Sequence, residues 1–162
     1  MSEETLRQEL NDAYKARAMI YYRVFEELRS EFGEEKATEI LKRAIYKHGL
    51  QISERFKKYA PDDLEGLRDA FMAKIPDNAA LFRPEVLRCD KDGLDIQLHR
   101  CPLKMVWLEN GISPEDVAKL TAIAGVVDNA TFEGAGFTFS AETWKPGREG
   151  CCLLKIRPGK KD

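Results

Sequence analysis

Residues 85–98, EVLRCDKDGLDIQL, mark the point at which the chain changes from a helical to a sheet-like pattern. Apolar and polar residues alternate over 85–89 and again over 94–98, which is the period of a half-buried strand. The residues between them, DKDG at 90–93, combine aspartates with a glycine and are typical of a hairpin turn. The sequence therefore predicts an antiparallel hairpin here.

Upstream of this hairpin the apolar residues recur at steps of three and four. One such stripe runs from Leu6 to Phe32 and predicts a long first helix, which Gly33 ends. The same period predicts a second helix over 34–58, in which Gly49 is a candidate kink, and a third over 63–74. Residues 1–82 are thus expected to form a helical half.

Downstream the strand period dominates. A strand is predicted over 104–108, then a helix from Ser113 and Pro114 to about residue 127, because Ser and Pro are a favoured cap and first position. A closing hairpin is predicted over 137–144 and 151–157, around PGREG at 146–150. The fold class is α+β: N-terminal helices packed on a C-terminal antiparallel sheet interrupted by one helix. We expect a single domain over 1–162, with the sheet in its half at 83–158.

Composition narrows the function classes. The chain has 162 residues, 43% hydrophobic and 33% charged, with a formal net charge of −2, which describes a globular protein with no need for a polyanionic partner. This charge also leads us to expect no nucleic-acid partner. Neither a signal peptide nor an 18-residue apolar run is evident, so we expect a cytoplasmic location and no membrane partner. The four cysteines are expected to be free thiols there.

The candidate site begins with His99 and Cys101. Two residues apart on a strand, they are expected to point the same way, which would bring an imidazole and a thiol into one pocket. Asp128 and His48 are the candidate helpers, although His48 lies on the apolar stripe of the second predicted helix and suits a core position. Asp128 follows the predicted helix end, where the dipole disfavours a negative charge, and this suggests a specific partner.

Three interpretations of this group stay open. In the first, His99 and Cys101 are ligands for a transition metal such as zinc or iron, although no CxxC or HExxH motif supports a metal site. The expected cofactor is therefore either none or such a metal. Alternatively, Cys101 acts as a thiolate nucleophile beside a histidine. The third is purely structural, with a surface histidine and a half-buried cysteine. Trp107 and Trp144 are candidate walls of a substrate pocket, and Arg148 is the candidate partner of a substrate carboxylate.

The second half of the chain resembles the L-2-amino-thiazoline-4-carboxylic acid hydrolase family. The matching fragments, in order, are Arg100-Cys101-Pro102, Trp107, Val127-Asp128, Phe137-Thr138-Phe139 and Gly147-Arg148-Glu149-Gly150-Cys151-Cys152. The resemblance implies hydrolytic opening of a cyclic amidine-like ring to give N-carbamoyl-L-cysteine. Cys101 would be the nucleophile, a histidine the proton carrier, Asp128 the orienting or ring-binding carboxylate and Arg148 the carboxylate partner. Metal-bound hydroxide held by His99 and Cys101 is the competing mechanism.

One position departs from the pattern of that family. Where the resemblance leads us to expect a thiol, three residues before Asp128, this chain has Gly125. The alternative function is therefore a non-catalytic small-molecule or metal-binding module, which a looser similarity to vinyl-reductase-type ligand-binding domains also suggests. The partners expected are a small-molecule substrate and, through the apolar stripe of the N-terminal helices, a second copy in a homodimer, which a polar residue at Phe25 or Leu28 should weaken.

Overall fold

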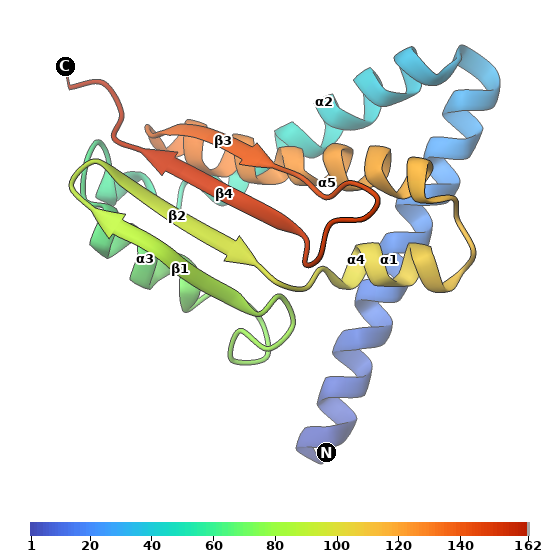
Figure 1. Cartoon of the computed structure of the whole chain (residues 1–162), viewed down its shortest axis with the longest axis horizontal. Coiled ribbons are helices and arrows are strands. Elements are labelled where there is room, and N and C mark those ends of the chain that lie inside the picture. The colour runs from blue at the N-terminus through green and yellow to red at the C-terminus, as the bar shows by residue number, and fades with distance from the viewer. Residues whose placement is uncertain (162) are drawn as a thin grey trace.

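The computed structural model describes residues 1–161 and consists of helices and one four-stranded sheet (Figure 1). The helices are α1 (Glu3–Phe32), α2 (Glu34–Ser53), a 3₁₀ turn (Lys57–Tyr59), α3 (Leu64–Met72), α4 (Pro102–Glu109) and α5 (Pro114–Ala135). The strands are β1 (Pro84–Asp90), β2 (Gly93–Leu98), β3 (Thr138–Glu142) and β4 (Cys152–Arg157). The predicted α+β class is confirmed, with α4 and α5 rather than one helix interrupting the sheet. No helix within residues 1–161 has the length and apolar character needed to cross a membrane.

Both predicted hairpins are present in the sheet. Its strand order is β1-β2-β4-β3, and all neighbouring strands are antiparallel. In the first hairpin Asp90 pairs with Gly93, as the turn at 90–93 predicts. In the centre, β2 pairs with β4 so that Leu98 lies opposite Cys152. This pairing places Cys101, which follows β2, and Cys151, which precedes β4, at the same end of the sheet.

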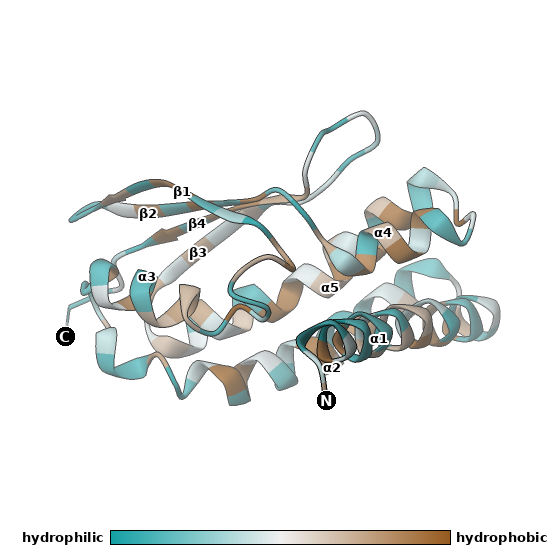
Figure 2. Ribbon diagram, turned by 90° about the horizontal axis from the view of Figure 1, so that it is seen from below, coloured by the Kyte–Doolittle hydropathy of each residue, from teal (hydrophilic) through white to brown (hydrophobic). Residues whose placement is uncertain are grey.

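The helices lie on one side of the sheet (Figure 2). Alternation along β2 buries Leu94, Ile96 and Leu98, and alternation along β4 buries Leu154 and Ile156. These side chains share one face because successive residues of a strand point to opposite sides. The buried face of the sheet therefore meets the helices, which is where an internal site can form.

The prediction of a strand over 104–108 is wrong, because this segment lies inside α4. Its N-cap is Cys101, whose backbone is extended and whose sulfur accepts a hydrogen bond from the Lys104 N–H at 3.5 Å. Pro102 occupies the first helical position, where its fixed φ favours a helix and its missing N–H costs nothing. Val106 and Trp107 are buried on this helix, and Trp107 donates its indole N–H to the Ala18 carbonyl of α1 at 2.7 Å.

Two predicted helix boundaries also differ. The second helix ends at Ser53 rather than residue 58, and the chain continues into the 3₁₀ turn. The helix predicted from Ser113 to about residue 127 is α5, which continues to Ala135. Gly136, at φ +109°, ends it. Asp128 therefore lies within α5, and the predicted conflict with the C-terminal end of a helix dipole is wrong.

Gly49 permits a close approach of two helices and does not end or divide α2. A Cβ atom added to Gly49 would lie 2.6 Å from the Cβ of Ala130 and 2.6 Å from the carbonyl oxygen of Val127, both on α5. The absence of a side chain thus allows α2 and α5 to pack at this point. This contact positions His48 and Asp128, the polar neighbours on the two helices, beside the same internal space.

Candidate functional site

A cavity of about 340 Å³ lies between the helices and the end of the sheet where β2 leads into α4. This volume is within the range of small-molecule sites. Most of its lining is aliphatic or aromatic, and side chains of α1, α2, α4 and α5 all contribute. The apolar lining includes Ile52, Phe56, Phe71, Phe82, Leu98, Leu103 and Trp107.

Cys101 is a buried residue that lines this cavity. Its sulfur receives a hydrogen bond from the Cys151 thiol, and this bond, with backbone N–H donors of α4 and the charge of Lys104, lowers the pKa of Cys101 to about 7 against the opposing effect of burial. The same hydrogen bond raises the pKa of Cys151, the donor. A substantial fraction of Cys101 is therefore thiolate near neutral pH, the form that acts as a nucleophile.

Asp128 lies on α5 and lines the same cavity. Asp128 is half-buried, and desolvation of its carboxyl raises the pKa of Asp128 to about 7, with the charge of Arg17 opposing the rise. Near neutral pH the group is therefore divided between its acid and carboxylate forms. A group in this condition can both donate and accept a proton, which is the requirement for general acid–base catalysis.

Arg17 and Tyr14 bring further polar groups into the cavity from α1. Arg17 donates from Nε to the Tyr21 hydroxyl at 3.3 Å, and its guanidinium lies 5.7 Å from the centre of the Tyr14 ring. Burial raises the pKa of Tyr14, and the charge of Arg17 opposes this. No carboxylate among residues 1–161 lies within ion-pair distance of Arg17. It is therefore available to an anionic ligand.

Three exposed basic side chains complete the lining: His48 and Arg55 from the second helix and the turn after it, and Lys74 after α3. Their exposure places them at the mouth of the cavity. His48 is therefore not the core residue that the apolar stripe favours, although it does line the predicted site.

The structure does not bring His99 to Cys101. β2 ends at Leu98, so the strand alternation that would orient both residues stops before either of them. His99 is exposed and its Nε2 lies 2.6 Å from a carboxylate oxygen of Glu85 on β1. Within the described part of the chain, 1–161, no three His, Cys, Asp or Glu side chains are grouped so as to hold a metal ion. His99 is outside the lining of the cavity, whereas Cys101 is part of it.

The predicted substrate-binding residues divide between the cavity and its surroundings. Trp107 lines the cavity. Trp144 is buried outside its lining and donates its indole N–H to the Arg148 carbonyl at 2.8 Å, while the Lys104 ammonium lies 5.3 Å from the centre of its ring. The side chain of Arg148 is also outside the lining and lies 3.6 Å from Glu142. Both residues support the turn before β4 and do not contact the cavity.

Several residues of the site are not predicted by sequence reasoning, among them Tyr14, Arg17 and Cys151. A signal for Arg17 exists in the sequence, because Tyr14, Arg17, Ala18 and Tyr21 follow the three-and-four spacing of one helix face. A cation within an apolar stripe is unusual and indicates a ligand or a buried partner. Cys151 carries no comparable local signal, because its proximity to Cys101 depends on the pairing of β2 with β4.

Two solved structures share the fold of this chain. The phenol-responsive sensory domain of the transcription activator PoxR, crystallised with phenol, has a TM-score of 0.57 and 14% identity, covering 89% of this chain and 74% of that one. A trafficking protein particle complex subunit 3 from Naegleria fowleri, covalently bound to palmitic acid, has a TM-score of 0.54 and 15% identity, covering 91% and 96%. At these identities the likeness concerns the fold alone.

A comparison with curated proteins gives no match. The model of one protein family, described as L-2-amino-thiazoline-4-carboxylic acid hydrolase, matches residues 12–153. The match extends from α1 to the start of β4, so it includes the helical half as well as the fragments after His99. Cys101, Asp128, Arg17 and Cys151 all lie within it. The chain therefore belongs to the L-2-amino-thiazoline-4-carboxylic acid hydrolase family.

Proposed function

We propose that the chain is a ring-opening hydrolase of a small cyclic amidine-like substrate, with Cys101 as its nucleophile. The single observation that carries the proposal is the position of buried Cys101 in the lining of a mostly apolar cavity that Asp128 also lines. The family name supports the reaction class. The apolar lining suits the body of a small ring, and the two ionisable groups suit nucleophilic attack and proton transfer.

The chemistry begins at the amidine carbon between the ring sulfur and nitrogen. Asp128 in its acid form protonates the ring nitrogen, and the Cys101 thiolate forms a bond to the carbon. Collapse of the adduct breaks the bond from that carbon to the ring sulfur. The ring sulfur leaves as a thiolate and takes a proton from the isothiouronium, so that a neutral isothiourea stays on Cys101. Water then attacks the same carbon with Asp128 as base, and Cys101 leaves as thiolate. The net change is addition of one water, giving an N-carbamoyl product.

Arg17 is the residue that we assign to a substrate carboxylate, in place of Arg148. A guanidinium in an apolar cavity without a carboxylate partner forms strong bidentate hydrogen bonds to a carboxylate ligand. Its proximity to Asp128, which is evident in the effect on the pKa of Asp128, would hold the ring close to both reactive groups. Arg55 and Lys74 at the mouth would attract an anion electrostatically.

The test uses L-2-amino-thiazoline-4-carboxylate and measures formation of N-carbamoyl-L-cysteine by mass spectrometry under reducing conditions. Cys101→Ser should abolish turnover, and Asp128→Asn should lower it by about 10²–10⁴-fold. Cys89→Ser is the matched control, because that thiol is half-buried outside the cavity and contacts the Leu64 carbonyl at 3.8 Å. Lack of turnover by the wild type, or full turnover by Cys101→Ser, would refute the proposal.

The role of Arg17 has its own experiment. Arg17→Gln should raise KM for the carboxylate substrate by about 10–100-fold, the equivalent of losing one charge-assisted bidentate contact. The same variant should change KM for the corresponding carboxamide little, and Arg148→Gln should change neither, since Arg148 lies outside the cavity. Equal losses on both substrates would show that Arg17 is structural.

A second candidate is a module that binds a small apolar molecule without converting it. The observation favouring it is the lining itself, in which apolar side chains predominate and Gly125 stands where the family resemblance leads us to expect a thiol. One protein of similar fold is a sensory domain crystallised with phenol. Calorimetric binding of phenol, with the ligand recovered intact and no turnover of the ring substrate, would favour this candidate.

A further inference from the structure

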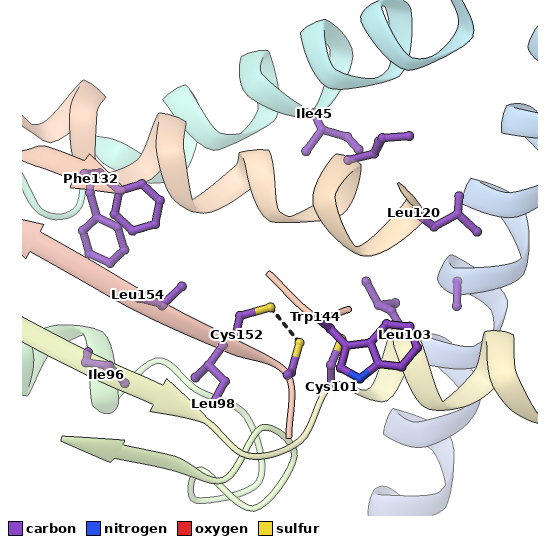
Figure 3. Close-up of a cluster of buried hydrophobic side chains, with 14 of the residues drawn as sticks. Ile45, Ile96, Leu98, Cys101, Leu103, Leu120, Phe132, Trp144, Cys152 and Leu154 are labelled. Carbon is purple, nitrogen blue, oxygen red and sulfur yellow. Dashed lines mark hydrogen bonds between the residues drawn. The ribbon is translucent and has the colours of Figure 1, made fainter. Parts of the chain in front are cut away.

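Three of the four cysteines meet at one side of the cavity. Cys101 caps α4, Cys151 directly precedes β4 and Cys152 is the first residue of β4, and all three line the cavity. The Cys151 N–H donates to the Leu98 carbonyl at 3.0 Å, which holds Cys151 beside the end of β2. Cys101 follows Leu98 by three residues. The sulfurs of Cys151 and Cys152 lie 2.7 Å apart, a contact that Figure 3 draws as a dashed line ending on Cys152.

We propose that Cys101 and Cys151 form a reversible dithiol pair that reduces hydroperoxides small enough to enter the cavity. This activity goes beyond hydrolysis, although it uses the same Cys101 sulfur as the proposed function. Hydrolysis needs only one sulfur as nucleophile, so the other two thiols that line the same cavity form no covalent bond in it.

The reaction balances in two steps. The Cys101 thiolate attacks the terminal peroxide oxygen, so that a sulfur–oxygen bond forms, the oxygen–oxygen bond breaks and the departing alkoxide takes a proton to become an alcohol. Cys101 is then a sulfenic acid, and the peroxide has gained two electrons. The Cys151 sulfur attacks the Cys101 sulfur, a disulfide forms, and the hydroxyl leaves with the Cys151 proton as water. A small dithiol reductant restores both thiols.

The backbone favours a Cys101–Cys151 bond over a Cys151–Cys152 bond. Consecutive Cα atoms are about 3.8 Å apart, below the roughly 4.4–6.8 Å that disulfides usually span. The adjacent pair therefore needs a distorted peptide in spite of its short sulfur contact. Cys101 and Cys151 lie on separate segments that are held together by the pairing of β2 with β4. Cys101 is also the thiol present as thiolate near neutral pH, so it is the one expected to react first.

The experiment treats the fully reduced wild-type protein with one equivalent of cumene hydroperoxide and maps disulfides in the unreduced digest by mass spectrometry. We expect loss of two thiols, one equivalent of cumyl alcohol and a cross-link between the peptides that contain Cys101 and Cys151. A Cys151–Cys152 disulfide as the main product, or Cys101 oxidised to sulfinic acid while Cys151 stays reduced, would overturn the proposal.

Two variants sharpen the result. In Cys151→Ser the sulfenic acid on Cys101 has no resolving thiol, so it should accumulate and be trapped by dimedone. Cys89→Ser should give the wild-type cross-link, because that thiol lies outside the cavity. The mapping requires no ring substrate and the hydrolysis assay runs with excess reductant, so failure of either proposal is visible independently of the other. If Cys151→Ser does not fold, the wild-type mapping alone decides.

Discussion

The state of Cys101 depends on its neighbours more than on its burial. The largest contribution to its lowered pKa is the hydrogen bond from Cys151, and the charge of Lys104 is a smaller one. We therefore expect Cys151→Ala to raise the pH midpoint of Cys101 alkylation by roughly one unit and Lys104→Gln to raise it by less. The measurement is the rate of iodoacetamide labelling of Cys101 against pH. An equal shift in both variants, or none, would contradict this order.

Asp128 makes stability depend on pH. Its pKa of about 7 in the folded protein lies above the value of about 4 for an unfolded chain, so its contribution to stability is complete below about pH 4 and is lost as the pH rises through 7. The Asp128→Asn variant has no ionisable group at this position, so its free energy of unfolding at pH 8 should be higher by up to about 4 kcal/mol, with little change at pH 4. Urea unfolding at the two pH values tests this. A gain that is the same at both would show that desolvation of the carboxylate is not the cause.

At the scale of single residues, the sequence predicted Cys101, Asp128, His48 and Trp107 as residues of one site. All four line the cavity. The expectation for His99 failed for a physical reason. Residues two apart share a face only while the strand lasts, and β2 ends one residue before His99. Arg17 carries a signal in its position within the apolar stripe of α1, but the cavity that it lines depends on elements far away in sequence.

At the scale of elements, two glycines in helices provide a matched pair. Gly49→Ala places a Cβ atom 2.6 Å from Ala130 and from the Val127 carbonyl, so it should lower the free energy of unfolding by about 2 kcal/mol or more despite the better helix propensity of alanine. In Gly125→Ala the added Cβ atom contacts only the Thr143 methyl group, at 3.5 Å. This variant should therefore raise the free energy of unfolding by about 0.5–1 kcal/mol. Urea denaturation of both variants measures these changes. A Gly49→Ala variant more stable than the wild type would mean that α2 and α5 are not in such close contact.

The elements that were predicted correctly are those with a long or clear period. The stripe of α1 extends over its whole length, and the hairpin at 85–98 combines alternation with a turn signal. α4 was assigned as a strand because an apolar run as short as Val106–Leu108 fits either period. The information that it is a helix lies in Cys101 and Pro102, an uncommon cap followed by a common first residue.

At the scale of the whole molecule, a homodimer through the N-terminal helices stays a prediction, but the residues that test it change. Phe25 is fully buried, so a polar residue there would disrupt the core rather than a dimer. Ile20 and Val24 are 62% and 40% exposed and lie one turn apart on α1. We expect Ile20→Lys with Val24→Glu to weaken a concentration-dependent dimer in sedimentation experiments. A wild type that sediments as a monomer at every concentration would refute the homodimer.

Because both the N-terminal helices and the sheet half line one cavity, a molecule seated there touches segments that are distant along the chain. Its binding free energy then opposes separation of those segments. A ligand at a hundred times its Kd would add about 2.7 kcal/mol to the free energy of unfolding. Thermal denaturation in the presence of a compound library thus offers a direct route to the natural occupant, with Arg17→Gln revealing which hits owe their effect to a negative charge.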